Sequence, residues 1–128
     1  MVNLLNEEAI RDKLLDYQPL ADLVGTRIFP LLRFGDMPSI TFQQISQPRQ
    51  QYGTIEPRYQ FSLWCNTYSE LKQLETAFID ATEHLTEIDG IVATYIEGNL
   101  TNYEEDTKIY SKFIDIFIRY VKTEQFED

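Results

Sequence analysis

The chain has 128 residues, a length that fits one folded domain, and we expect that domain to span residues 1–128. Hydrophobic residues make up 43% and aromatic residues 13% of the chain, which excludes a disordered protein. The net charge is −10, with six basic and seven acidic side chains in residues 1–64 but five basic and fourteen acidic ones in residues 65–128. No cluster of lysine and arginine is present, which argues against specific nucleic-acid binding.

The N-terminal part of the chain predicts two helices and a short extended segment. Asn6 is a suitable N-cap for a first helix over about residues 7–16, which carries apolar side chains on one face. Pro19 suits the first turn of a second, short helix, and Gly25 suits its C-terminal end. Residues 27–29 then read as an extended piece.

The middle of the chain predicts two strands joined by a long loop. Residues 38–46 read as the first strand, and residues 58–66 as a second strand in which apolar and polar residues alternate. Residues 47–57 contain two prolines and a glycine without periodicity, which indicates a loop. Trp64 interrupts the polar face of the second strand, so it is either a contact residue or a residue buried under a helix.

The best helix signal begins at Thr67, which forms a capping box with Glu70. Residues 68–87 follow, with one apolar stripe that consists of Leu71, Leu74, Phe78, Ala81 and Leu85. Residues 91–97 then predict a strand, and residues 98–108 predict an acidic loop. A helix of this length returns the chain to the start of strand 58–66, so strand 91–97 should run parallel to it. Loops 47–57 and 98–108 should therefore lie at opposite ends of the sheet.

The final strand is expected at residues 109–121 and is apolar on both faces. It is about twice as long as a usual strand, so either part of it overhangs and pairs with another chain, or a bend wraps it around the same core. Taken together, these elements predict an α+β fold. Its mostly antiparallel sheet has four to five strands, with N-terminal helices and one long amphipathic helix packed on it.

Nothing in the sequence points to catalysis, a metal or a cofactor, and we expect no enzyme. His84 is the single histidine and lies at the edge of the apolar helix stripe, which favours a partly buried structural role. Cys65 is the single cysteine and falls on the apolar face of a strand, which favours an inert buried thiol. The N-terminus lacks the features of a signal peptide, and no apolar run is long enough to span a membrane.

One gapped pattern resembles a known family. It runs from Leu14 to Phe42 and includes Leu20-x-x-Leu23, Gly25-x-Arg27-Ile28-Phe29-Pro30 and Pro38-x-Ile40-x-Phe42. This pattern resembles the tail-completion proteins of long-tailed bacteriophages, which include tail-to-head joining and tail-terminator proteins. The later order of strand, capped helix, strand, acidic loop and final strand is also similar to that family.

The resemblance implies a structural virion protein that is assembled in the host cytoplasm. It would form a homo-oligomeric ring, of six copies in the family, between the tail tube protein and the head-side connector protein. DNA would pass through such a ring without specific binding. An acidic loop formed by Glu104, Glu105 and Asp106 would face the lumen and repel the DNA phosphates.

Four aromatic residues are candidates for contacts with other subunits or partners: Tyr52, Trp64, Phe117 and Tyr120. A second hypothesis is a cytoplasmic adaptor module that binds a partner protein along an exposed strand edge. Replacing Trp64 would distinguish these two roles. Loss of a contact residue should weaken a partner complex and leave the fold intact, whereas loss of a core residue should unfold the domain.

Overall fold

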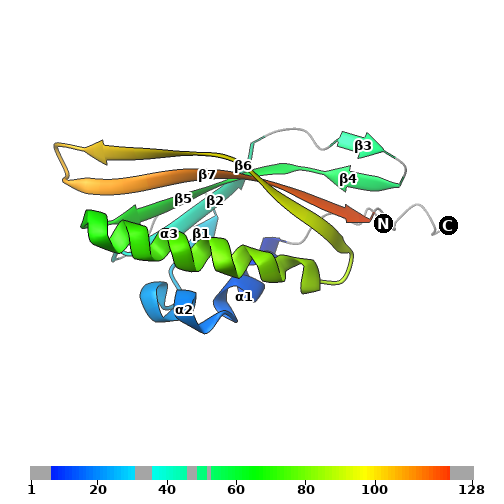
Figure 1. Ribbon diagram of the computed structural model, residues 1–128, viewed down its shortest axis with the longest axis horizontal. Coiled ribbons are helices and arrows are strands. Elements are labelled where there is room, and N and C mark those ends of the chain that lie inside the picture. Colours follow the sequence, from blue (N-terminus) through cyan, green and yellow to red (C-terminus); the bar gives the residue numbers. More distant parts are fainter. Residues whose placement is uncertain (1–6, 31–35, 46–48, 52, 122–128) are drawn as a thin grey trace.

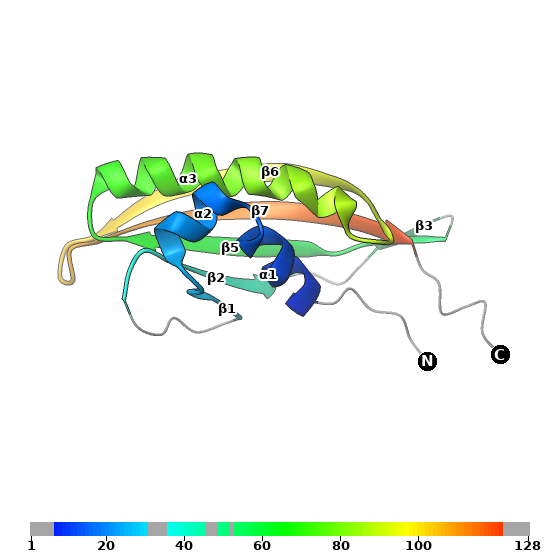
Figure 2. The same ribbon diagram turned by 90° about the horizontal axis from the view of Figure 1, so that it is seen from below.

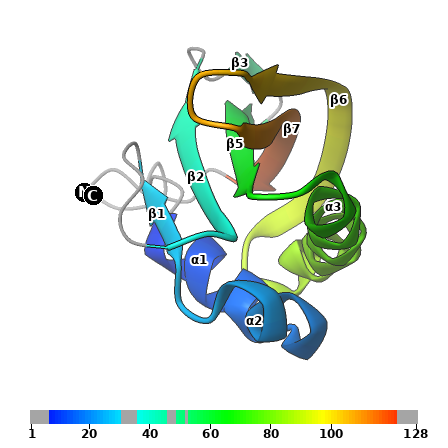
Figure 3. The same ribbon diagram turned by 90° about the vertical axis from the view of Figure 1, so that its left-hand side faces the viewer.

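The computed structural model describes residues 7–30, 36–45, 49–51 and 53–121, and it has two layers (Figure 1). One layer is a twisted sheet of seven strands, and the other consists of the helices. Figures 2 and 3 show that the helices all lie on one side of the sheet, and no described element covers its other face. The α+β class and the mostly antiparallel pairing agree with the sequence prediction, but the sheet has more strands than expected.

Two N-terminal helices begin the helical layer: α1 (Glu7–Leu15) and α2 (Gln18–Val24). Gly25 ends α2 with a φ of 63°, a left-handed conformation that glycine adopts without a steric penalty. Arg11 then links α1 to the sheet, because its Nε donates to the carbonyl oxygen of Ile28 and its Nη2 to that of Thr26, both at 2.8 Å. The predicted N-cap Asn6 lies outside the described residues.

The third helix, α3 (Tyr68–Thr82), continues into a 3-10 turn, η1 (Glu83–Glu87). The Oγ1 of Thr67 accepts a hydrogen bond from the backbone N–H of Glu70, which confirms the predicted N-cap. The Glu70 carboxylate in turn accepts from the backbone N–H of Asn66. All members of the predicted apolar stripe are fully buried: Leu71, Leu74, Phe78, Ala81 and Leu85.

The sheet has the strand order β1-β2-β5-β7-β4-β3, and β6 pairs with β7. Its strands are β1 (Ile28–Pro30), β2 (Ser39–Gln44), β3 (Arg49–Gln51), β4 (Thr54–Glu56), β5 (Arg58–Cys65), β6 (Ile91–Glu104) and β7 (Ile109–Val121). Because β5 and β6 are both antiparallel to β7, they run in the same direction, as predicted, with β7 between them.

The segment predicted as loop 47–57 is mostly a small hairpin, and the loop prediction was wrong there. β3 pairs with β4, and β4 continues the sheet by pairing Thr54 and Ile55 with the C-terminal end of β7. Gly53 has a φ of 83°, which suits the tight connection between the two strands. The strands are only three residues long, too short for a periodic signal, so their neighbours decide their conformation.

The predicted acidic loop 98–108 is mostly strand as well. β6 extends to Glu104, and only residues 105–108 form the turn before β7. The register shifts between Ile96 and Gly98, so Gly98 is accommodated in the strand beside a bulge. The two hairpin turns, after β3 and after β6, nevertheless lie at opposite ends of the sheet, as expected for the two segments (Figure 1).

Of the two alternatives for the final strand, the overhang is wrong. β7 pairs with β6 from Ile109 to Tyr120 and, on its other side, with β5 and β4 from Tyr110 to Val121. Hydrogen-bonding partners within the same chain therefore flank the strand on both sides along nearly its whole length. The long strand with one strand neighbour is β6 instead.

The hydrophobic core lies between the sheet and the helices. Its aromatic centre joins strands and helix, because the ring of Phe61 lies 5.3 Å from that of Phe42 and 5.0 Å from that of Phe78. Tyr59 packs beside Phe42 at 6.5 Å, and burial raises the pKa of its phenol. This core holds the sheet rigid and leaves its edge and its open face to make any external contacts.

Candidate functional site

The outer edge of β6 is the first candidate surface. Within the part of the chain that the structure describes, β6 pairs with β7 alone. Among the residues whose burial the structure describes, seven large hydrophobic side chains are exposed, and five of them lie on this strand: Val92, Tyr95, Ile96, Leu100 and Tyr103. Leu100 is 64% exposed and Val92 51%. A long strand edge with apolar side chains is a typical site for pairing with another chain.

The sequence-based search missed these β6 residues. Their signal was present, since Ile91–Ile96 has no polar face and an exposed face of that strand must then be apolar. The composition of β6, however, does not reveal that β7 lies on one side of it and solvent on the other. The overhang alternative therefore assigned the unpaired apolar edge to the wrong strand.

The tip of the β6–β7 hairpin carries the predicted acidic residues. Residues 97–108 are all exposed, and the hairpin reaches one end of the molecule (Figure 1). Glu104 is the last residue of β6, whereas Glu105 and Asp106 lie in the turn. The turn is closed by the backbone N–H of Lys108, which donates to the carbonyl oxygen of Glu104 at 2.8 Å. The three acidic side chains thus form one exposed negative group.

Trp64 and Phe117 both lie on the face of the sheet that points away from the helices, but at opposite ends of the β5–β7 pairing, where Trp64 lies opposite Ser111 and Phe117 opposite Arg58. Trp64 is half-buried, its Nε1 donates to Thr41 Oγ1 at 3.0 Å, and its ring meets that of Phe113 edge-on at 6.1 Å. Phe117 is half-buried beneath the guanidinium of Arg58, 5.8 Å from its ring centre. Neighbours on the same sheet hold both side chains in place.

Ion pairs cross the strands on this open face. Asp115 accepts hydrogen bonds from Arg58 and from Gln60, and Arg119 pairs with Glu56 at 3.2 Å. In these pairs, each basic side chain of the open face is matched by an acidic side chain on the same face. Within the described residues, charged side chains of the open face thus pair with one another, whereas no strand lies beside the outer edge of β6.

Two predicted contact residues do not belong to either surface. Tyr120 is only 5% exposed and is part of the hydrophobic core, because its side chain lies on the face of β7 that packs against the helices. Its prediction as a contact residue is therefore wrong for this folded chain. Tyr52 lies outside the described residues.

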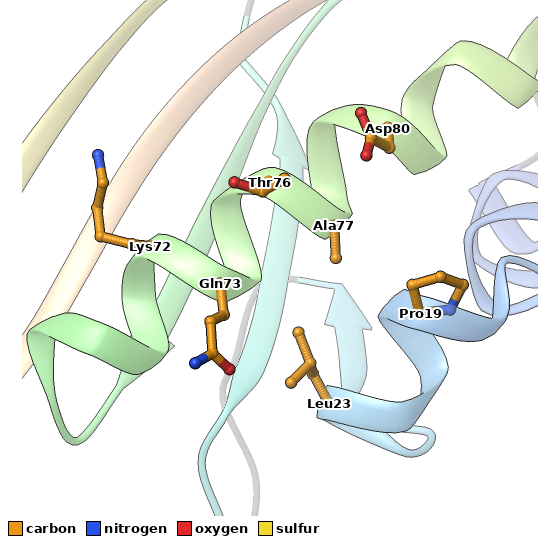
Figure 4. A pocket seen from close by; sticks show the side chains of 7 residues that line it. All are labelled: Pro19, Leu23, Lys72, Gln73, Thr76, Ala77 and Asp80. Atoms are coloured by element: carbon orange, nitrogen blue, oxygen red, sulfur yellow. The ribbon is translucent and has the colours of Figure 1, made fainter.

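A shallow groove of about 510 Å³ separates α2 from α3 (Figure 4). Pro19 and Leu23 of α2 face Ala77 of α3 across it, with Lys72 near one end and Asp80 near the other. Gln73 and Thr76 of α3 also line the groove, which thus combines an apolar surface with polar side chains from α3.

His84 and Cys65 have the partial and the full burial, respectively, that the sequence predicted. His84 is half-buried, stacks on Tyr17 with ring centres 5.3 Å apart, and pairs with Glu87 at 2.9 Å. Cys65 is buried, and burial raises the pKa of its thiol to about 12. Among the described residues, no group of three or more His, Cys, Asp or Glu side chains could hold a metal ion, and no helix is long and apolar enough to cross a membrane.

Comparisons with known proteins give one informative result. No family model and no curated protein matches the chain. Among solved structures, the chain is similar to one chain of a structure described as the virion of a native gene transfer agent particle. The TM-score is 0.62 at 13% sequence identity, over 94% of this chain and 99% of that chain. At this identity the similarity shows a shared fold, and it extends over nearly the whole length of both chains.

Proposed function

We propose that this chain is a structural subunit of a phage-like virion, where copies form a ring at the head–tail junction. The ring, of six copies as in the tail-completion proteins that the sequence resembles, would complete the tail tube and join it to the head-side connector. The observation that carries this proposal is the shared fold with a chain of a virion particle over 94% of this chain and 99% of the other.

The shape of the chain supports ring formation. A closed ring requires two different surfaces on each subunit, one for each neighbour. The sheet offers β6 at one lateral edge and β1 at the opposite one. The hairpins at its two ends provide separate axial surfaces, one for the tail tube and one for the connector (Figure 1).

Charge supports passage of DNA through such a ring. Glu104, Glu105 and Asp106 are exposed at the hairpin tip, and the proposal places them at the pore. Negative side chains at a pore repel the DNA phosphates at short range, so DNA would pass without being held. The excess of acidic residues in the second half of the chain is consistent with this role.

Native mass spectrometry and negative-stain electron microscopy of the purified chain, alone and with purified tail tubes, test the proposal. We expect a closed ring with a central pore, formed in solution or at the tube end. A chain that stays monomeric in both samples and forms no ring at tube ends would contradict the proposed function.

A second candidate function is an adaptor that accepts a strand of an unrelated protein, and the exposed edge of β6 is the observation that favours it. This function predicts a wild-type chain that remains monomeric and forms a one-to-one complex with its partner. The same mass measurement therefore separates the two functions.

A further inference from the structure

The outer edge of β6 lacks the usual protection of a free strand. Natural edge strands are kept from pairing by lysine, proline, short length or bulges. β6 has 14 residues, about 48 Å at 3.4 Å per residue, and contains no lysine and no proline. It has two register irregularities, yet its exposed apolar side chains continue beyond both of them. Such an edge fits a strand that is paired in the assembled protein.

The chemistry of β6 restricts what can pair with it. The strand carries Glu97 and Glu104 and has no basic side chain. Leu100 lies opposite Phe113, whose ring meets that of Trp64 on the open face of the sheet. A partner strand should therefore lack acidic residues, and it should supply apolar side chains that continue the row of Trp64, Phe113 and Leu100.

The first six residues of the chain have this chemistry. They precede α1, lie outside the described residues and read Met1-Val2-Asn3-Leu4-Leu5-Asn6, with no charged side chain and four large apolar ones. Residues 122–128 at the other end of the chain carry three acidic side chains and one basic one, which makes them a poor partner for β6. We call residues 1–5 the arm, because Asn6 is the expected N-cap of α1.

The arm precedes a helix that lies on the other side of the molecule from β6. Arg11 of α1 donates to the carbonyl oxygens of Thr26 and Ile28 beside β1. Figure 3 shows α1 on the side of β1 and α3 on the side of β6. A heterologous ring contact places the β6 edge of one copy beside the β1 side of the next. The arm of the next copy is then within reach of β6, whereas α3 separates each α1 from the outer edge of its own β6.

The arm of a neighbouring copy also begins at a suitable level along β6. The negative charge of Glu7, the first residue of α1, adds to burial in raising the pKa of Tyr59, so the two side chains lie close together. Tyr59 lies opposite Ile116 on β7, which lies opposite Ile96 on β6. In a closed ring, where copies have no axial shift, the arm therefore begins level with Ile96. Five extended residues span about 17 Å, enough to reach Leu100.

We propose that residues 1–5 of each copy pair as an added antiparallel strand with the outer edge of β6 in the next copy, with Leu4 packed near Leu100. The direction follows from the exposed surface, because residues 97–104 are all exposed whereas η1 packs beside the start of β6. An arm that runs from the level of Ile96 toward the hairpin tip is antiparallel to β6. The inference rests on the proposed ring and names the segment that links its subunits. The occupant of the β6 edge is thus a segment of a second copy of this chain.

Deleting residues 2–5 tests the contact. The deletion keeps Met1 and Asn6 and removes no described residue, so the single chain should fold as the wild type does, and circular dichroism checks this. We expect subunit association to weaken at least about 100-fold, because large apolar side chains of the arm would lose their contacts with β6. Native mass spectrometry and light scattering measure this as loss of the ring.

Deleting residues 125–128 is the matched control. It removes the same number of residues from the other end of the chain, also outside the described part. A general effect of shortening the chain on association would appear in both deletions. We expect the control to form a ring with the same number of subunits as the wild type.

A substitution on β6 tests the other side of the contact. Leu100→Lys places a charged side chain, the natural protection of an edge strand, where the arm would pack. Leu100 is 64% exposed, so the fold should be unaffected, and we expect the same loss of the ring. Gln73→Lys adds the same charge at an exposed position on α3, beside the groove with α2, and should leave the ring intact.

Thiol cross-linking gives an independent measurement. One chain carries Leu4→Cys and another carries Leu100→Cys, while Cys65 stays buried in both. Because the arm and the edge come from different copies, a short bis-maleimide should give covalent dimers only when the two variants are mixed. The double variant should give a ladder of covalent oligomers up to the full ring.

The outcomes separate the inference from the proposed function. A ring that survives both the deletion of residues 2–5 and Leu100→Lys overturns the arm contact but leaves the ring function standing. A ladder without any closed ring supports the contact and refutes the ring. Covalent dimers from Leu100→Cys alone would show pairing of two β6 strands, and a link within one chain of the double variant would show pairing of the arm with its own β6. Either result, or the absence of cross-links, overturns the inference.

Discussion

β6 and β7 are adjacent strands of similar length, 14 and 13 residues, but their surroundings are opposite. β7 has strands on both sides, and α3 covers the alternate side chains that include Ile114 and Ile116. On β6, all residues from Glu97 to Glu104 are exposed. The contrast shows that the position of a strand in the sheet, more than its apolar content, decides which strand presents a surface to partners.

The largest expected effect compares one side chain from each strand. Ile114→Ala on β7 should lower the free energy of unfolding by about 2–5 kcal/mol, because Ile114 is fully buried and a cavity would remain. Leu100→Ala on β6 should change it by less than about 0.5 kcal/mol in the monomer. Urea denaturation of both variants measures the difference. Equal losses would mean that Leu100 is packed within its own chain.

The next effect concerns the ion pair that fixes α3 over β7. The Nζ of Lys112 lies 3.0 Å from Glu75 Oε2, and the side chains are 10% and 14% exposed. Lys112→Ala should cost about 2 kcal/mol, because it leaves the carboxylate of Glu75 buried with only Lys72 near it. The double variant Lys112→Met with Glu75→Gln should recover part of this loss in the same urea experiment. A single variant with wild-type stability would show that the pair does not hold the helix.

A smaller effect is expected at the start of the helix that covers β7. Thr67→Ala removes the acceptor for the backbone N–H of Glu70 and should cost about 1 kcal/mol of unfolding free energy. Ser69→Ala, an exposed position in the first turn of α3, serves as the control and should be nearly neutral. Thermal unfolding of both variants would show whether the cap or the first turn in general sets the stability of α3.

The smallest effect depends on pH and involves the contact of α1 with η1, just before β6. Hydrogen bonds from Lys13, and then from His84, lower the pKa of Glu87 from 4.5 to about 2. A lowered carboxyl pKa contributes stability above the ordinary pKa, and this contribution is lost as the pH falls through the folded-state pKa. Glu87→Gln should therefore reduce the melting temperature slightly at pH 6.

The difference between this variant and the wild type should shrink as the pH falls toward 2 and vanish below it, because Glu87 is then protonated in the folded state as well. Exposure of this pair to solvent keeps the effect small, and added salt should reduce it further. A difference in melting temperature between Glu87→Gln and the wild type that is unchanged from pH 6 to pH 2 would show that the ion pair is not its cause.

The helices could be predicted because their signals are local. The capping box at Thr67 and Glu70, the stripe from Leu71 to Leu85 and the stop at Gly25 each act within a few residues of the chain. Alternation in β5 likewise revealed which side chains enter the core. The site was harder to predict, because Trp64 and Phe117 were found on the open face but Tyr120 proved to be buried.

By itself, the sequence determined the α+β class, the amphipathic helix, the burial of Cys65, the partial burial of His84, and the acidic character of the second half. Tertiary structure alone decided which long strand is interior, that residues 49–56 form a hairpin, and that the free edge belongs to β6. The physical reason is that a strand's hydrogen bonds are made with residues distant in the sequence. Its neighbours are therefore set by the whole fold, whereas a helix satisfies its own backbone.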